Sequence, residues 1–190
     1  MNSEIRKKFK LTRDTSDIYL DCAAMTQIPT DVIHAVREAL DLRGNPNRSG
    51  HKYALRSKTL LDTARKDIAE FIGAQLEEVI FTKGTTDSIH IACDALAHQF
   101  EEGDTIILSS SEHNSNLLPY LKLRRRGVNI KYINNGDRGI KVEDVRMLLT
   151  PKTRMVSLSH CSNVLGTIQD IAAISREIKS YNKNILFLVD

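Results

Sequence analysis

From residue 79 onward the sequence alternates short apolar stretches with longer amphipathic ones. The apolar stretches predict strands at 79–82, 105–110, 129–134, 155–160 and 185–190. The amphipathic stretches between them predict helices at 86–100, 116–125, 142–149 and 171–181. Strands that alternate with helices are joined by crossover connections, which build a parallel sheet with helices on its faces. The sequence therefore predicts an α/β fold with a mainly parallel sheet and flanking helices.

The first 78 residues lack this alternation. Residues 18–29 are expected to be extended, and Thr30 is expected to cap a helix that runs to about Leu42. A polar loop at 44–51 leads to a second, long helix at about 55–72. We expect residues 1–78 to form an arm with helices that packs on the sheet domain, residues 79–190, or on a partner subunit.

Charge and composition exclude several classes of function. The net charge is only +3, and the densest basic run, at 122–126, falls at the end of a predicted helix. Cations suit that position because of the helix dipole, although a nucleic-acid patch is the alternative interpretation. We expect no nucleic-acid partner. No apolar run is long enough to cross a bilayer, so no membrane partner is expected either.

The cysteines and the N-terminal residues point to an intracellular protein without a metal. Cys22, Cys93 and Cys161 are far apart, and none stands at metal-ligand spacing. Neither a disulfide framework nor a metal site is therefore expected. Residues 1–10 are charged and contain no apolar core segment, which argues against a secretory signal. A cytoplasmic location is the resulting expectation.

A small polar corner, Gly84-Thr85-Thr86, follows the first predicted strand. Ligands of open parallel sheets bind beyond the carboxyl ends of the strands, so this corner is a candidate binding site. The first turn of a helix presents unpaired backbone N–H groups, which suit a phosphate. An ordinary helix cap explains the threonines equally well. The two standard glycine-rich nucleotide fingerprints are absent.

Three further polar residues follow later strands: His113, Asn163 and Asp190. A loop histidine is often a plain surface residue, and asparagine is common in loops, so each signal alone is weak. Their joint placement is more specific, because all should meet at one edge of the sheet. Phosphate donors, an imidazole, an amide and a carboxylate together suit a phosphorylated pyridine ring.

Six stretches of the chain resemble the N-terminal half of class V, fold-type I pyridoxal-phosphate enzymes. They are YLDCAAMTQIP, NPNRSGH, FTKGTTDSI, EHNSNLLPY, LTPKTRMVSLSHCSNVLGTIQDI and the terminal LVD. Cysteine desulfurases and selenocysteine lyases are the most similar members. The stretches occur in family order and spacing over nearly the whole chain. The resemblance implies pyridoxal 5'-phosphate as cofactor, an amino acid as substrate and a homodimer in the complete enzyme. It also implies that residues 79–190 are the first part of the cofactor-binding large domain.

The resemblance also implies roles for particular residues. Thr85 and Thr86 would hold the cofactor phosphate, and Asn163 would hydrogen-bond the phenolic oxygen of the ring. His113 would stack on the ring as the candidate catalytic residue and assist proton transfer. Asp190 would pair with the protonated pyridine nitrogen. Two more residues match a loop near the active site at the dimer interface, namely Arg48 and His51.

Two departures from the family pattern concern the substrate and the catalytic lysine. The usual LDNAATT reads LDCAAMT, with Cys22 and Met25 at positions that lie near the substrate in the family. Cys22 is either a sulfur-handling nucleophile or a small buried hydrophobe. No lysine of this chain occupies the position of the family's Schiff-base lysine, which lies beyond residue 190.

These observations leave three interpretations. The first is the cofactor-binding half of a pyridoxal-phosphate enzyme, incomplete without a complementary C-terminal half. The second is a non-catalytic interaction module that retains the cofactor cradle. The third is an unrelated doubly wound nucleotide-binding domain, against which the missing glycine-rich fingerprints count.

Overall fold

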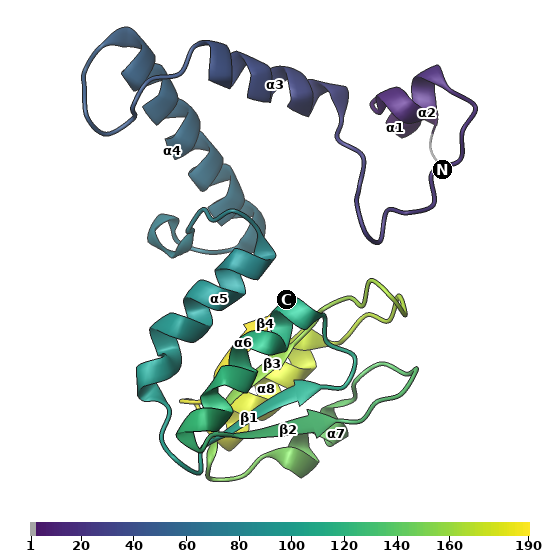
Figure 1. Ribbon diagram of the computed structural model, residues 1–190, viewed down its shortest axis with the longest axis vertical. Helices are drawn as coiled ribbons and strands as arrows, with labels where there is room; N and C mark the ends of the chain where they lie inside the picture. Colours follow the sequence, from purple (N-terminus) through teal and green to yellow (C-terminus); the bar gives the residue numbers. More distant parts are fainter. Residues whose placement is uncertain (1–2) are drawn as a thin grey trace. The chain divides into compact units, whose positions relative to one another are not determined.

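The computed structural model describes residues 3–190, which cluster into two compact units, one that ends at Phe81 and one that spans residues 82–190 (Figure 1). Unit 1 consists of helices and connecting segments, and unit 2 contains the whole of the sheet. Within the described residues, no helix is both long enough and apolar enough to span a membrane.

Unit 1 contains four α-helices and one short 3-10 helix among its described residues. Their bounds are α1 Ser3–Lys7, α2 Lys10–Asp14, α3 Thr30–Asp41, α4 Lys52–Ile72 and η1 Leu76–Glu78. Thr30 is the first residue of α3 rather than its cap, because Pro29 occupies the cap position. Helix α4 begins three residues before the predicted start, since the His51 side chain accepts a hydrogen bond from the Ala54 N–H and caps it. Gly73 ends α4 in the left-handed conformation that favours glycine, with φ 70°.

The predicted strand at 79–82 is wrong. These residues are assigned to no strand, and no strand of the described chain pairs with them. The apolar pattern is present, but a strand also requires a neighbour with which to exchange backbone hydrogen bonds. The Val79 carbonyl instead accepts a hydrogen bond from the side chain of Arg65 at 3.3 Å.

Unit 2 is built around four parallel strands in the order β2-β1-β3-β4. The strands are β1 Thr105–Ser109, β2 Asn129–Ile133, β3 Thr153–Leu158 and β4 Leu186–Val189. The helices of this unit are α5 Thr85–Leu96, η2 Ala97–Gln99, η3 Asn114–Asn116, α6 Leu118–Leu121, η4 Lys122–Arg126, α7 Val142–Leu148 and α8 Ile171–Tyr181. The prediction of a parallel sheet with flanking helices is confirmed.

The predicted helix at 116–125 is divided in the structure. It consists of η3, one turn of α-helix in α6, and η4. Pro119 stands in the first turn of α6, because proline has no N–H to donate and is tolerated only there. Gly127 closes the segment at φ 79°. The amphipathic pattern thus predicted a helical segment at the right place, but it did not predict the division into η3, α6 and η4.

Helices flank both faces of the sheet (Figure 1), and apolar side chains of the strands pack against them. On one face, Ile106, Leu108 and Met155 pack in one cluster with residues of α5, α6 and η4. On the other face, Ile107, Val156 and Leu158 pack with residues of α7 and α8. Neighbouring strand residues therefore point into different halves of the core, as expected for parallel strands that are buried on both sides.

We expect Ile107→Ala to lower the free energy of unfolding by about 2–5 kcal/mol, because it leaves a cavity in the centre of the sheet. Ile107 is fully buried in the core cluster between the sheet and the helices α7 and α8. The matched control is Ile91→Ala, since that side chain is 51% exposed. Urea denaturation followed by circular dichroism measures both. Equal losses in the two variants would contradict this description of the core.

Candidate functional site

Residues from four separate segments line one pocket in unit 2. The pocket has a volume of about 300 Å³ and lies where α5 begins and where β1, β3 and β4 end. Its lining residues are Thr85, Thr86, His113, Ser115, Ser159, Cys161, Asn163 and Asp190. The five residues that were predicted to bind the cofactor are among them. Sequence reasoning missed Ser115, Ser159 and Cys161, although each stands within two residues of a predicted site residue or strand end.

The corner formed by Gly84, Thr85 and Thr86 depends on the backbone conformation of Gly84. Gly84 has φ 148° and ψ 175°, a conformation that residues with a side chain rarely adopt. Its carbonyl accepts the N–H of Ser88 at 3.0 Å, so the first helical turn of α5 starts there. The N–H groups of Thr85 and Thr86 then have no acceptor within the helix. They lie at the positive end of a helix of 12 residues, which suits an anion.

Side-chain hydrogen bonds stabilise the loop at this corner. The hydroxyls of Thr82 and Ser88 are 2.7 Å apart, and the Gly84 N–H donates to Thr82 Oγ1 at 3.3 Å. The N–H of Lys83 donates to Asp87 Oδ2 at 3.2 Å, so the acidic side chain in the first turn is engaged by the backbone. These contacts hold the loop in shape and leave the threonine N–H groups to a ligand.

His113 is oriented by the residue two places after it. Its Nδ1 accepts the N–H of Ser115 at 3.2 Å and lies 2.5 Å from the Ser115 hydroxyl. A nitrogen that accepts a hydrogen bond carries no proton, so the neutral ring holds its proton on Nε2. The imidazole, which lines the pocket, can therefore present a donor there, and Ser115 selects that tautomer.

Asn163 lies in a tight turn after β3. The N–H of Ser162 donates to the Thr167 carbonyl at 3.0 Å, and the N–H of Gly166 donates back to the Ser162 carbonyl at 2.9 Å. The Ser162 hydroxyl also accepts hydrogen bonds from the backbone N–H groups of Val164 and Leu165, which stabilise the turn. Gly166 has φ 70°, so the glycine is required by the turn. This internal bonding fixes the backbone that carries Asn163.

Asp190 follows β4 and is paired with the end of β3. Its N–H donates to the Leu158 carbonyl at 3.0 Å, and its carbonyl accepts from the His160 N–H at 2.7 Å. Burial raises the pKa of the Asp190 carboxyl above its ordinary value, the negative charge of Glu112 raises it further, and His113 lowers it. A cation bound beside Asp190 would favour the ionised carboxylate.

The remaining residues named from the sequence belong to unit 1. His51 caps α4, and Arg48 lies in the loop before it. Cys22 is exposed and lines a small apolar pocket of about 310 Å³ with Ile5, Phe9 and Tyr19. The buried-hydrophobe interpretation of Cys22 is therefore wrong for this structure. The predicted roles of Arg48 and His51 stay predictions.

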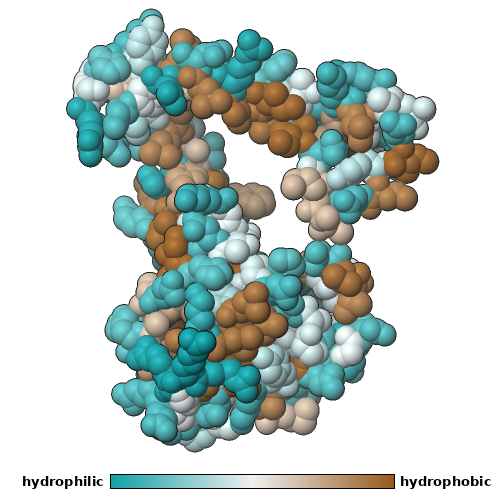
Figure 2. Space-filling model, in the orientation of Figure 1, coloured by the Kyte–Doolittle hydropathy of each residue, from teal (hydrophilic) through white to brown (hydrophobic). Residues whose placement is uncertain are grey.

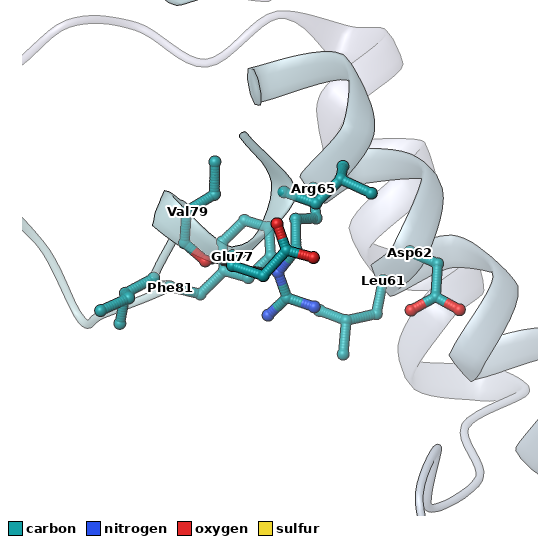
Figure 3. Close-up of a pocket in the computed structure, with 8 residues that line it drawn as sticks. Leu61, Asp62, Arg65, Glu77, Val79 and Phe81 are labelled. Atoms are coloured by element: carbon teal, nitrogen blue, oxygen red, sulfur yellow. Dashed lines mark hydrogen bonds between the residues drawn. The ribbon is translucent and has the colours of Figure 1, made fainter. Parts of the chain in front are cut away.

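A larger hollow, about 860 Å³, lies beside α4 in unit 1 (Figure 3). The Arg65 guanidinium lies over the Phe81 ring, 5.3 Å from its centre, and also donates to a backbone carbonyl. Its cation is thus already engaged, and the rest of the lining is mostly apolar. The smaller pocket in unit 2 has the convergent polar groups that a ligand requires, so we take it as the functional site.

Comparison with known proteins shows the family of the chain. The sequence profile of the class-V aminotransferases matches residues 18–190. A probable cysteine desulfurase of Methanothermobacter thermautotrophicus is 35% identical over 192 residues, covering 98% of this chain and 46% of that protein. A probable cysteine desulfurase of Borreliella burgdorferi is 37% identical and covers 94% of this chain and 44% of that protein.

Solved structures show the same likeness. The apo cysteine desulfurase from Thermococcus onnurineus superposes with a TM-score of 0.89 at 31% identity, covering 98% of this chain and 46% of that chain. The cysteine desulfurase CsdA from Escherichia coli superposes with a TM-score of 0.83 at 29% identity. This chain thus spans a little under half the length of these relatives. By its sequence match over residues 18–190, the chain belongs to the class-V aminotransferase family, whose members depend on pyridoxal 5'-phosphate.

Proposed function

We propose that this chain is the cofactor-binding half of a pyridoxal-phosphate enzyme of cysteine desulfurase type. The observation that carries the proposal is that one pocket is lined by all five residues predicted to bind the cofactor, namely Thr85, Thr86, His113, Asn163 and Asp190. The named relatives support cysteine as the amino-acid substrate, because they are cysteine desulfurases. The complete enzyme would need a complementary C-terminal half that supplies the Schiff-base lysine.

The chemistry of the pocket's donors fits the cofactor. The N–H groups and hydroxyls of Thr85 and Thr86 would hold the phosphate at the start of α5. Asn163 would donate to the phenolic oxygen of the ring, and Asp190 would accept from the ring nitrogen. When bound, the pyridine ring withdraws electrons and stabilises negative charge that develops at the substrate's α-carbon.

His113 would serve two purposes in this arrangement. Its ring would stack on the face of the pyridine, which would be held by Thr85 and Thr86 at one end and by Asp190 at the other. With Nδ1 held by Ser115, the proton on Nε2 is available at the pocket. In the doubly protonated ring, Nδ1–H would donate to the Ser115 hydroxyl and Nε2 would give up its proton as an acid. The Nε2 lone pair that remains would then take a proton back as a base.

Exposed apolar side chains on α3 support a homodimer. Val32, Val36 and Leu40 recur every four residues on this helix, and each is about half exposed or more. Figure 2 shows hydrophobic residues gathered over α3. An apolar helix face of this kind is suited to burial against another protein surface. We propose a second copy of the enzyme as that surface.

Thr86→Ala should weaken the binding of pyridoxal phosphate to the 190-residue chain by about 1–3 kcal/mol, the cost of losing a hydrogen bond to a charged group. Thr63→Ala on the exposed surface of α4 is the matched control and should bind as the original chain does. An absorbance titration with the cofactor gives both affinities. Unchanged affinity in Thr86→Ala would refute the phosphate assignment.

Asp190→Asn should keep the fold and abolish most turnover in the complete enzyme. The neutral amide no longer favours a protonated ring nitrogen, and the ring then withdraws electrons less strongly. Sulfide release from cysteine measures turnover, and the thermal unfolding curve measures the fold. Turnover at the original rate would show that Asp190 has another role.

The 190-residue chain alone should bind pyridoxal phosphate reversibly, without a borohydride-reducible lysine adduct and without sulfide production from cysteine. A complementary C-terminal half supplied in trans should restore both. Steady sulfide production by the chain alone would overturn the proposal. Cofactor binding that never leads to activity with the complementary half would favour the non-catalytic interaction module.

A further inference from the structure

Glu112, which stands beside His113 but outside the lining of the pocket, receives hydrogen bonds from three elements. Ser109 Oγ at the end of β1 donates to its Oε1 at 2.5 Å. Asn116 Nδ2 in η3 and Ser159 Oγ after β3 each donate to its Oε2 at 2.7 Å. A carboxylate, which accepts hydrogen bonds and donates none, matches a set of three donors. Glu112 therefore ties the ends of β1 and β3 to the loop that carries His113.

The contacts of Glu112 continue into the core. Asn116 is fully buried, and its Oδ1 accepts a hydrogen bond from Ser157 Oγ at 2.6 Å. The Tyr120 hydroxyl in turn donates to Ser157 Oγ at 3.1 Å. Burial raises the pKa of Tyr120 to about 12, so the hydroxyl keeps its proton and stays a donor. The Glu112 carboxylate is thus linked to the core by the hydrogen-bonded side chains of Asn116, Ser157 and Tyr120.

The same carboxylate is connected to Asp190 through Ser159. Strands β3 and β4 pair Leu158 with Val189, and the Asp190 backbone bonds to the residues on either side of Ser159. Ser159 is both the strand neighbour of Asp190 and a donor to Glu112. The negative charge of Glu112 is one of the causes that raise the pKa of Asp190. Two acidic groups therefore act on the same end of the pocket.

We propose that Glu112 is a positioning residue that fixes the His113 loop and adds a second negative charge behind Asp190, so that this end of the pocket prefers a cationic ring nitrogen. The inference rests on the proposed function. Asp190 alone would meet a protonated nitrogen as a single ion pair. With Glu112 behind it, the potential at that nitrogen is more negative, and in a partly buried site this charge is less screened by solvent.

The isosteric variant Glu112→Gln separates the charge from the hydrogen bonds. The glutamine oxygen can accept from Asn116 and Ser159, and its amide can donate to the Ser109 hydroxyl, which rotates to suit. The matched control is Glu143→Gln, which removes the same charge from an exposed position on α7. Thermal unfolding curves establish that each variant is folded.

The experiment compares two probes, pyridoxal phosphate and its 1-deaza analogue, in which carbon replaces the ring nitrogen. The original chain should prefer pyridoxal phosphate. Glu112→Gln should reduce that preference by about threefold to tenfold, up to the equivalent of one pKa unit, and leave binding of the deaza analogue within about twofold. Glu143→Gln should change neither affinity. A purely structural role of Glu112 would weaken both probes alike.

Each outcome supports or overturns a distinct claim. If the original chain binds both probes equally, the role of Asp190 in the proposed function is wrong, and the inference falls with it. If the original chain prefers pyridoxal phosphate and Glu112→Gln keeps the full preference, the inference alone is wrong. Glu112→Asp, which keeps the charge, should retain the preference, and this gives an answer even where the glutamine variant fails to fold. Loss of the preference in Glu112→Asp would also contradict the inference.

Discussion

The parallel pairing of β1 with β2 on one side and with β3 on the other is the interaction on which the rest of unit 2 depends. It directs the carboxyl ends of all four strands to the same edge of the sheet. The segments that follow β1, β3 and β4 then emerge side by side, whatever their distance along the chain. Pocket residues such as His113, Ser159 and Asp190 are neighbours for this reason. Helix packing on both faces secures the sheet but does not itself choose this edge.

A polar chain runs from that edge into the core without leaving a buried group unsatisfied. Ser157 lies on a strand whose other residues are mostly apolar, and it is fully buried. Its hydroxyl is engaged by both Asn116 and Tyr120, which removes the desolvation penalty of an unpaired group. Polar groups in a core demand a particular geometry of their neighbours, whereas apolar contacts tolerate small shifts. The hydrogen bonds from Tyr120 through Ser157 and Asn116 therefore hold Glu112, and with it the His113 loop, in a fixed position relative to the core.

The sequence was sufficient for the sheet and for most of the pocket, because both follow from patterns along the chain. Strands β1 to β4 are marked by apolar runs, and the predicted site residues follow strand ends or precede a helix. The segment at 79–82 has the same apolar pattern but no partner strand, and pairing is a property of distant residues that a local pattern does not contain. Ser159 and Glu112 were missed for a similar reason. Serines and glutamates are common, and their meeting across β1 and β3 becomes visible only when the strands are side by side.

The strand order also has a consequence for the sequence of folding events. β2 lies between β1 and β3 along the chain, yet β1 lies between β2 and β3 in the sheet. The chain must pass from one side of β1 to the other before β3 can pair, and such non-local pairing is slow because a long loop has to close first. β4 pairs only with β3, so it is joined to the rest of the sheet through β3. The edge that gathers Thr85, His113, Asn163 and Asp190 exists only when β1, β3 and β4 are all paired, and a ligand that binds there would select chains whose sheet is fully assembled.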